Sequence, residues 1–252
     1  IVDSLVYNVG LWGCDDVEID NLKIVGCWRF NSDGIDFHNC RRCHVTGCFV
    51  RTYDDTICFK GHMGYQQVCE DILVENCVVW CDWDHCLETG AECCAEHMRN
   101  LTFRNIDVIR SLDVAMNIGN VDYGWVHDVL FEDIRVETDE VYQQPRIQRD
   151  DAESFPVDPD SAWLPSLMSC SVTKHHEYSQ GRPERGRISD IAFRNIQVFS
   201  DRMLPSFFSG YDAGHRVENV SIDGLFLNGR RLTTLAEAAV RVGDHAANIR
   251  LK

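Results

Sequence analysis

The sequence lacks long hydrophobic runs, although hydrophobic residues make up 44% of its 252 positions. No stretch approaches the ~18 uninterrupted apolar residues of a membrane-spanning helix, which excludes a membrane span. Basic residues are scarce, because 24 Lys and Arg stand against 40 Asp and Glu, for a formal net charge of −16. A chain this acidic repels a phosphate backbone, so we expect no nucleic-acid partner and favour neutral ligands over polyanions.

One short pattern recurs along the chain: apolar, any, apolar, two polar or small residues, apolar, any, apolar. Its copies begin at Val17, Cys43, Ile72, Leu101, Val129, Ile191 and Val220, separated by 26, 29, 29, 28, 62 and 29 residues. Alternating apolar positions predict two short strands around a polar corner in each copy. Repeats that cannot bury their own apolar faces must stack. The sequence therefore predicts an all-β fold, a right-handed parallel β-helix of about seven to nine coils.

We expect residues 1–252 to form a single β-helix domain with a loop excursion at about 138–187. The gap of 62 residues exceeds two periods by a few residues, which leaves room for a degenerate coil plus a loop. Five of the six prolines fall in it, a composition typical of an excursion: Pro145, Pro156, Pro159, Pro165 and Pro183. The chain starts at Ile1 without a visible solenoid cap, which leaves open that N-terminal coils are missing.

Thirteen cysteines follow the same repeat. Cys14, Cys40 and Cys69 share one position of the coil, and Cys48 and Cys77 share another. Cysteine at such positions behaves as a small buried hydrophobe, so we predict stacked core thiols. The Cys40-Arg-Arg-Cys43 motif has no second pair at zinc-ribbon spacing, and we expect neither a metal nor a cofactor.

The turn before each coil's opening strand carries an unusual column of ionisable residues. Asp33, Asp55, His85 and Asp113 align there by period, with Asp54 beside Asp55. Groups stacked at the ~5 Å spacing of paired strands repel one another, which raises some of their pKa values. Single aspartates often cap turns, but a solenoid has no structural need for a whole column. We interpret it as a functional site.

Paired carboxylates on neighbouring coils suit glycoside hydrolysis. One must stay protonated to donate to the leaving oxygen, while another stays ionised to activate water or attack carbon. Crowding among Asp33, Asp54 and Asp55 can split their pKa values in this way. His85, one coil further, can hold the arrangement by hydrogen bonding. The residues thus predict a hydrolase with a carbohydrate partner.

These motifs resemble those of glycoside hydrolase family 28, the polygalacturonases and their relatives. Asn31-Ser-Asp33-Gly-Ile-Asp matches the family's Asn-Thr-Asp motif, and Asp54-Asp55-Thr-Ile-Cys-Phe-Lys60 matches its Asp-Asp motif one coil on. Asp84-His85-Cys86-Leu87 stands where the family has Gly-His-Gly-Leu, after a longer connection. The resemblance implies an inverting hydrolase with Asp55 as general acid and with Asp33 and Asp54 activating the water. It also implies a secreted or periplasmic location, although so many thiols suit a reducing compartment.

One departure from that family concerns the substrate. The family's Arg-Ile-Lys motif binds the sugar carboxylate, and by period it would fall near Met116 to Ile118. This sequence has no Lys or Arg from Ser111 to Ile134, so a galacturonate unit would lack its counter-charge there. We therefore expect a neutral or mixed α-linked glycan. The sequence is also similar to family 49, the dextranases and isopullulanase, which cut neutral α-glucans with three similarly placed aspartates.

Substrate-binding residues are predicted from strand parity and from neighbours of the acids: Asn31, Lys60, Trp83, Glu88, Asp113 and Asn117. Trp83 either stacks on a sugar ring or packs at a corner of the coil. Two other functions stay open, a polysaccharide lyase, which usually needs calcium held by acids, and a non-catalytic carbohydrate-binding β-helix. The glycan, its linkage, endo or exo action and the oligomeric state do not follow from the sequence.

Overall fold

The computed structural model describes residues 1–138, 165–174, 179 and 183–252, and these residues form two long sheets. An eight-stranded sheet contains β1 (Val9–Trp12), β4 (Ile35–His38), β7 (Ile57–Gly61), β9 (Leu87–Cys93), β11 (Val114–Asn120), β13 (Ser166–Val172), β15 (Ser206–Ser209) and β18 (Val240–Val242). An eleven-stranded sheet contains β2 (Glu18–Asp20), β3 (Lys23–Ile24), β5 (Arg41–Thr46), β6 (Phe49–Thr52), β8 (Val68–Cys81), β10 (His97–Arg110), β12 (Trp125–Glu137), β14 (Arg187–Phe199), β16 (Val217–Leu227), β17 (Arg230–Arg231) and β19 (Ala246–Leu251).

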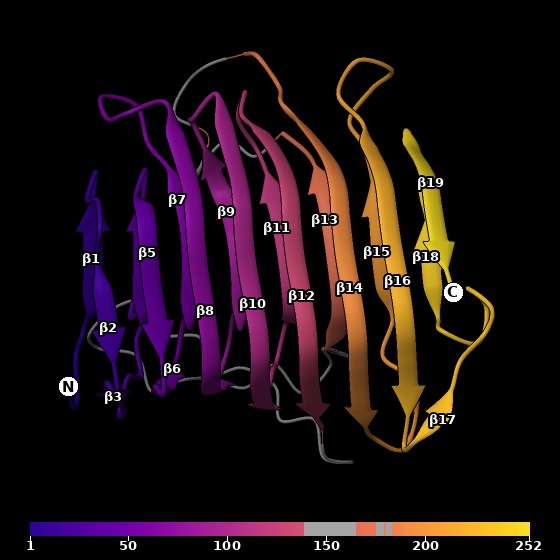
Figure 1. Cartoon of the computed structure of the whole chain (residues 1–252), viewed down its shortest axis with the longest axis horizontal. Helices are drawn as coiled ribbons and strands as arrows, with labels where there is room; N and C mark the ends of the chain where they lie inside the picture. Colours follow the sequence, from indigo (N-terminus) through magenta and orange to yellow (C-terminus); the bar gives the residue numbers. More distant parts are fainter. Residues whose placement is uncertain (139–164, 175–178, 180–182) are drawn as a thin grey trace.

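Both sheets grow along one axis as the chain winds from its N-terminus to its C-terminus (Figure 1). Neighbouring strands pair in parallel, and the antiparallel contact of β16 with β17 is the exception among the described residues. The described part of the chain has no α-helix, and hence none with the length and hydropathy to cross a membrane. The prediction of an all-β parallel β-helix is confirmed, and the eight strands of the smaller sheet agree with the expected number of coils.

The sequence repeat sets the register of the eleven-stranded sheet. Its first apolar residues pair directly, Ile72 with Leu101 and Leu101 with Val129. At the polar corner, Asn76 and Asn105 adopt left-handed φ values of 56° and 53°, a region that Asn tolerates well. The side-chain amide of Asn105 donates to Oδ1 of Asn76 at 2.7 Å. The ladder continues through this corner, so β8, β10, β12, β14 and β16 are single long strands rather than the two short strands expected for each coil.

The strands on either side of the long gap between repeats are neighbours in this sheet. Val129 on β12 pairs with Ile191 on β14, so the two strands are direct neighbours. Within the expected excursion, β13 (Ser166–Val172) supplies this coil's strand of the eight-stranded sheet, between β11 and β15. Residues 139–164, 175–178 and 180–182 of that excursion lie outside the described residues.

The core between the sheets is built from stacked columns of one side chain per coil. Phe103, Phe131 and Phe193 form one such column on β10, β12 and β14 and are fully buried, with successive ring centroids 5.1 and 5.0 Å apart. Phe59 on β7 of the facing sheet packs on Phe103 at 4.7 Å. Because each ring packs on the rings above and below, a repeat that could not bury itself becomes stable in the stack.

The cysteines occupy the same interior. All thirteen lie among the described residues, none forms a disulfide, and all except the half-buried Cys14 are buried. Cys48 and Cys77 lie on neighbouring coils at equivalent positions, with 3% and 1% of their surface exposed. The prediction of stacked core thiols is confirmed.

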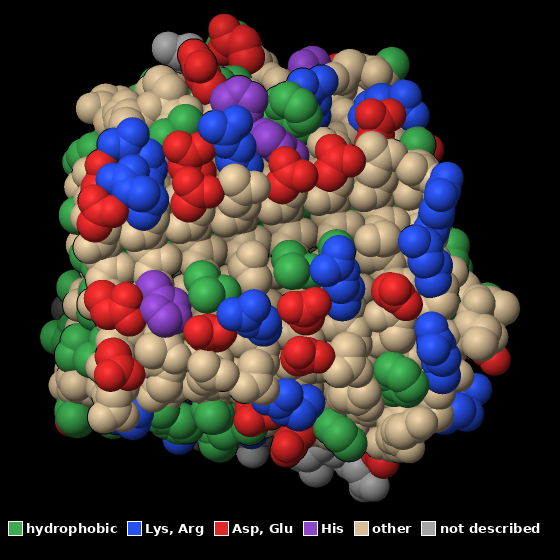
Figure 2. Space-filling model, in the orientation of Figure 1, with side chains coloured by type: hydrophobic (Ala, Val, Ile, Leu, Met, Phe, Trp, Pro, Cys, Tyr) green, Lys and Arg blue, Asp and Glu red, His purple; other side chains and the backbone are tan. Residues whose placement is uncertain are grey.

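The outer face of the eleven-stranded sheet carries acidic and basic side chains among uncharged ones (Figure 2). Arg99 pairs with Glu70 at 2.8 Å and Arg104 with Glu75 at 2.7 Å, each across two neighbouring strands. The arginine side chains are 40% and 43% exposed, so these ion pairs are solvated. Buried charges gather instead on the eight-stranded sheet.

Candidate active site

Stacking of the coils brings the predicted acids together at the start of β4, β7 and β9. The backbone amide of Gly34 donates to the carbonyl of Asp55 at 2.8 Å, which places Asp33 next to Asp55 on the following coil. A Cβ atom on Gly34 would lie 2.2 Å from the carbonyl oxygen of Thr56, so only glycine permits this close approach. The glycine after Asp33 is therefore part of what positions the acids.

A pocket of about 490 Å³ opens over these turns. Nine of the ten predicted site residues line it: Asn31, Asp33, Asp54, Asp55, Lys60, Trp83, His85, Glu88 and Asn117. The tenth, Asp113, is not among the lining residues, but its Oδ2 lies 3.6 Å from Nε2 of His85. The structure thus brings the predicted residues together around one cavity, while the role of each stays a prediction.

The alignment that placed Asp113 in the column of His85 is wrong by one residue. Leu87 pairs with Met116, and the amide of Cys86 donates to the carbonyl of Val114. Asp113 therefore stands level with Asp84, and β11 is shifted relative to its expected register. The sequence could not show the correct register, because the residues of β11 are nearly all buried. Alternation of apolar and polar residues therefore does not indicate which of its side chains point inward.

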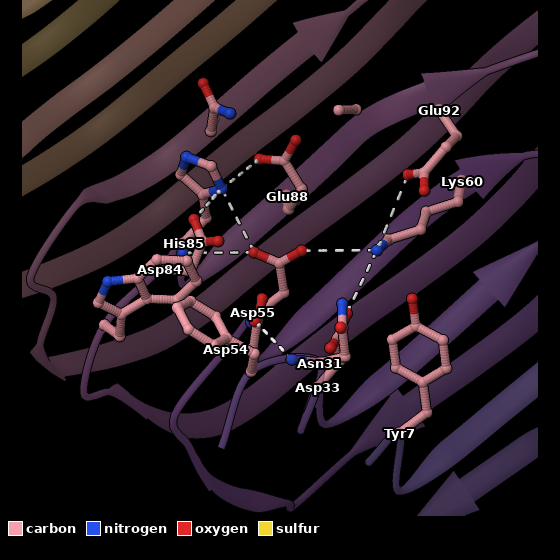
Figure 3. A pocket seen from close by; sticks show the side chains of 14 residues that line it. Tyr7, Asn31, Asp33, Asp54, Asp55, Lys60, Asp84, His85, Glu88 and Glu92 are labelled. Carbon is pink, nitrogen blue, oxygen red and sulfur yellow. Dashed lines mark hydrogen bonds and ion pairs between the residues drawn. The ribbon is translucent and has the colours of Figure 1, made fainter. Parts of the chain in front are cut away.

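Asp55 lies at the centre of the pocket, between Lys60 and His85 (Figure 3). Its Oδ1 is 3.3 Å from Nδ1 of His85 and accepts the backbone N–H of His85 at 3.3 Å. Its Oδ2 is 3.6 Å from Nζ of Lys60. Burial opposes ionisation, but the hydrogen bond from His85 and the charge of Lys60 hold the pKa of Asp55 below its usual value. Asp55 is ionised at neutral pH.

Asp54, the adjacent residue, has the opposite electrostatic environment. Its carboxylate oxygens accept backbone N–H groups of Asn31 at 2.8 Å and Asp55 at 3.0 Å. Burial, together with the negative charges of Asp55 and Asp84, raises the pKa of Asp54 to about 8. The pKa values of two consecutive aspartates are therefore shifted in opposite directions, which favours the protonated form of Asp54 and the ionised form of Asp55.

Lys60 is a buried cation on β7, surrounded by acids. Its Nζ lies 3.2 Å from Asp33, 3.6 Å from Asp55, 3.8 Å from Asp36 and 3.9 Å from Glu92. Burial alone would lower the pKa of Lys60, but Cys58 and the carboxylates of Asp36, Asp33 and Asp55 raise it well above its usual value. The ammonium group, predicted as a partner of sugar hydroxyls, thus contacts carboxylates in this structure. Burial and the nearby Asp36 in turn raise the pKa of Asp33.

His85 forms a second cationic centre on the other side of Asp55. Its Nδ1 lies 2.8 Å from Asp84 and 3.6 Å from Glu88. Burial alone would lower the pKa of His85, but Asp84 and Glu88 raise it well above its usual value, so the ring is an imidazolium. Burial raises the pKa of Glu88 to about 8, and its side chain is hydrogen-bonded to that of Asn117.

An aromatic wall closes one side of the pocket. Trp83 packs edge-on against Phe30, with centroids 4.4 Å apart at 87°, and stacks parallel to Tyr53 at 5.8 Å and 10°. Trp83 and Phe30 both line the cavity. The two roles considered for Trp83 coexist, since it packs at a corner of the coil and also presents a surface to the pocket.

Sequence reasoning missed five lining residues: Tyr7, Phe30, Asp84, Ala91 and Glu92. Asp84 precedes His85 directly, so its adjacency was an available signal. The repeat period could not place Glu92 in the pocket, because the pairing of β9 with β7 is irregular. Phe59 pairs with Thr89 but Gly61 pairs with Cys93, so β9 contains two more residues than β7 over this stretch.

Two groups of side chains offer ligand atoms within 4.8 Å of one another, as a metal ion would require: Asp33, Asp54 and Asp55 in one, and Asp55, Asp84 and His85 in the other. Carboxylate oxygens suit hard cations such as Ca²⁺. The ammonium group of Lys60, 3.2 Å from Asp33, already supplies positive charge to the first group.

Comparison with protein-family models and with curated proteins gave no match. Among solved structures, the chain is similar to a hyperthermoactive exopolygalacturonase from Thermotoga maritima, with 18% sequence identity and a TM-score of 0.50. The match covers 88% of this chain and 50% of that one, so the chain spans about half the length of that enzyme. The resemblance first drawn from the aspartate motifs is thereby confirmed for the fold: the chain has the parallel β-helix architecture of a polygalacturonase.

Proposed function

We propose that the protein is a glycoside hydrolase that acts on an α-linked poly- or oligosaccharide, neutral or mixed in composition. The observation that carries this proposal is the pair Asp54 and Asp55, adjacent carboxyl groups in one pocket with pKa values shifted in opposite directions. Glycoside hydrolysis requires one protonated and one ionised carboxyl group at the scissile bond.

The roles of the two residues follow from where the proton resides. Asp54 carries it and donates it to the leaving oxygen, whereas Asp55 accepts a proton from the attacking water. This assignment gives Asp54 the acid role that the family resemblance had given to Asp55. His85 and Lys60 act as positioning residues, because both contact the carboxylate of Asp55 and keep it ionised.

The charge of the pocket supports a neutral sugar over a uronate. Lys60 is the one Lys or Arg among the lining residues, and four carboxylates surround it. Asn117 lies where the family's basic motif was expected, and it is hydrogen-bonded to Glu88. A sugar carboxylate would meet the negative charge of these acids, because the two cationic groups of the pocket, Lys60 and His85, are already paired with them. Sugar hydroxyls, in contrast, can bind to amide and carboxyl groups.

The family resemblance implies inversion at the anomeric carbon. Inverting enzymes typically hold their two carboxyl groups about 6.5–9.5 Å apart, which leaves room for the attacking water. Proton NMR of the first product tests directly whether the configuration at the anomeric carbon is inverted. An inverted anomer supports the proposal, and a retained anomer shows that one aspartate attacks the sugar.

The decisive experiment measures reducing-sugar release from dextran, pullulan, polygalacturonate, rhamnogalacturonan and arabinogalactan, with the protein and with Asp54→Asn. We expect release from a neutral or mixed glycan and none from the variant. Release from polygalacturonate as the preferred substrate would contradict the substrate assignment. Binding without release by the native protein would support a non-catalytic carbohydrate-binding β-helix.

A polysaccharide lyase is the second candidate, because the acid groups around Asp55 fit a cation such as calcium. A lyase product carries a new double bond and absorbs ultraviolet light, and a chelator abolishes its formation. Sugar release that continues in chelator and yields no absorbing product rejects this candidate.

A further inference from the structure

A pair of histidines lies on the outer face of the eleven-stranded sheet, away from the pocket that holds the acids. His97 on β10 pairs in register with Trp125 on β12, and His127 follows two residues later on β12. Nδ1 of His97 and Nε2 of His127 are 2.9 Å apart. Figure 2 shows histidine side chains together near the upper end of this face, where β10 and β12 begin. We call His97 and His127 the histidine pair.

The histidine pair borders a cavity of its own. His97 lines a surface cavity of about 530 Å³, which shares no lining residue with the pocket over the acids. The ring of His97 is half-buried, whereas the side chain of His127 is 9% exposed. Solvent and small ions therefore reach the pair from the side of His97.

A carboxylate fixes the orientation of the His127 ring. Oδ2 of Asp128 lies 2.7 Å from Nδ1 of His127. Because an ionised carboxylate only accepts hydrogen bonds, Nδ1 of the uncharged ring carries the hydrogen and Nε2 presents its lone pair toward His97. A carboxylate on the far nitrogen of an imidazole is the arrangement that orients metal-bound histidines and makes them more basic.

The His97 ring can supply a second lone pair. Burial, and then the neighbouring His127 and Arg99, lower the pKa of His97, so the ring is uncharged at neutral pH. Its one hydrogen lies on Nδ1, which donates to Nε2 of His127. Nε2 of His97 has no hydrogen-bond partner among the described residues. The hydrogen can therefore move to Nε2 by way of solvent, which frees Nδ1 as a ligand atom without net loss of a proton.

The distance between the two nitrogens indicates which metal geometry fits. Two imidazole nitrogens bound at about 2.0–2.1 Å lie about 2.9 Å apart when the angle between them is 90°. A tetrahedral angle, which zinc prefers, places them about 3.3–3.4 Å apart. The observed 2.9 Å matches the square-planar or tetragonal sites of copper(II) and nickel(II), once the rings tilt so that both lone pairs face the same point.

The surroundings carry charges of both signs. Asp128 contacts the histidine pair directly, Glu96 lines the adjoining cavity, and the chain as a whole has a formal net charge of −16. Arg185 and Arg187 also line the cavity and oppose a cation there. A small anion bound by these arginines is thus the alternative that the experiment must distinguish.

We propose that His97 and His127 bind one divalent transition-metal ion, copper(II) or nickel(II), which joins two neighbouring coils on the outer face of the eleven-stranded sheet. Nδ1 of His97 and Nε2 of His127 are its ligands, water fills the other positions, and Asp128 holds the ring of His127. The proposal departs from the expectation of no metal, because the two histidines are 30 residues apart and no sequence motif marks them.

The test is calorimetric titration of the full chain, freed of metal by dialysis against a chelator, with nickel(II) chloride. We expect one ion that is lost or bound at least tenfold more weakly by His97→Asn and by His127→Asn, and about tenfold more weakly by Asp128→Ala. Copper(II) should bind more tightly than nickel(II). Native affinity in both histidine variants, or no binding by the native protein, would overturn the site.

A matched control is His215→Asn. His215 lines the same cavity and has its Nδ1 2.8 Å from Asp212, but it is not part of the histidine pair. This variant should bind nickel(II) with native affinity. A loss equal to that of His97→Asn would place the ion elsewhere in the cavity and overturn the proposal. Melting temperatures without metal show whether each variant folds like the native protein.

Fluorescence locates the bound ion. The ring centroid of Trp125 lies 4.1 Å from that of His127, so copper(II) at the pair should quench the emission of Trp125. Trp125→Phe should remove most of the quenching and keep the affinity. Quenching that is equal in this variant would place the ion elsewhere. Binding of sodium sulfate without binding of nickel(II) would replace the metal by an anion at Arg185 and Arg187.

This proposal stands apart from the proposed function. Its readout is metal binding, and sugar release by His97→Asn should equal that of the native protein. Absence of sugar release would overturn the hydrolase and leave the metal site unaffected, whereas absence of metal binding would overturn the site alone.

Discussion

The two sheets of this β-helix use the same strand register to place charges beside one another, with opposite consequences. On the eleven-stranded sheet, Arg104 and Glu75 meet at 2.7 Å with the arginine 43% exposed. On the eight-stranded sheet, Lys60 has 7% of its side chain exposed and lies within 3.9 Å of four carboxylates. Both groups hold opposite charges within 4 Å of each other, but only the group around Lys60 is shielded from solvent.

That difference determines what each group can do. A solvated ion pair contributes little to stability, because water and salt screen it. A buried ion cluster is costly to form and strongly destabilising to break, because a partner left behind is an uncompensated charge. Burial also adds a desolvation contribution to the pKa shifts of the cluster, and it is the largest cause of the raised pKa values of Asp33 and Asp54. The eight-stranded sheet thus carries the buried charged groups, while the outer face of the eleven-stranded sheet carries solvated ion pairs.

The largest effect is expected from Asp54→Asn, which removes the proton donor while keeping the shape of the side chain. Loss of a general acid lowers kcat by about 10²–10⁴-fold. We expect a loss in that range with an unchanged melting temperature or a higher one. Reducing-sugar assays and thermal unfolding check this, and a variant with native activity would remove Asp54 from the mechanism.

Lys60→Met tests the buried cluster itself. Removing the buried cation that lies within 3.9 Å of Asp33, Asp36, Asp55 and Glu92 should cost about 3–5 kcal/mol of unfolding free energy. Urea denaturation measures the change. A loss below about 1 kcal/mol would show that the cluster is as well solvated as the surface pairs.

The pH dependence of activity should reveal the raised pKa of Asp54. The acid works only when protonated, so kcat should fall as pH rises through about 8, by about tenfold per pH unit beyond it. The free energy of unfolding should also decrease as pH rises. The contribution from burying Asp54 and Glu88 in neutral form is complete at acid pH and is lost as pH rises toward about 8. A pH–rate profile flat across that range would contradict the assignment of the proton.

The smallest effect is expected from Arg104→Met, the surface counterpart of Lys60→Met. Arg104 pairs with Glu75 on the outer face of the eleven-stranded sheet. Its loss should change the unfolding free energy by less than about 1 kcal/mol and leave sugar release unchanged. A change as large as that from Lys60→Met would show that exposure does not explain the difference between the two sheets.

Much of the fold could be predicted because the interior of a solenoid repeats. A side chain such as Phe103 must fit the ones above and below it, so burial imposes a visible period of 26–29 residues. Prediction from the period was wrong or incomplete where burial of all side chains or a long insertion hid the repeat. It misplaced Asp113 by one residue on the buried strand β11, and it could not show that Val129 and Ile191 are direct neighbours.

The same limit applies to the site. Spacing by period was enough to predict that Asp33, Asp55 and His85 share one end of a sheet, since parallel strands in register align equivalent residues. It could not reveal which of the two consecutive aspartates holds the proton, nor that Glu92 and Tyr7 enter the pocket. The sequence by itself determined the solenoid and the column of acids, because both follow from a repeat. Only the tertiary structure decided the direction in which the pKa of each acid shifts, because burial and the contacts of Lys60 and His85 arise from side chains on several coils at once.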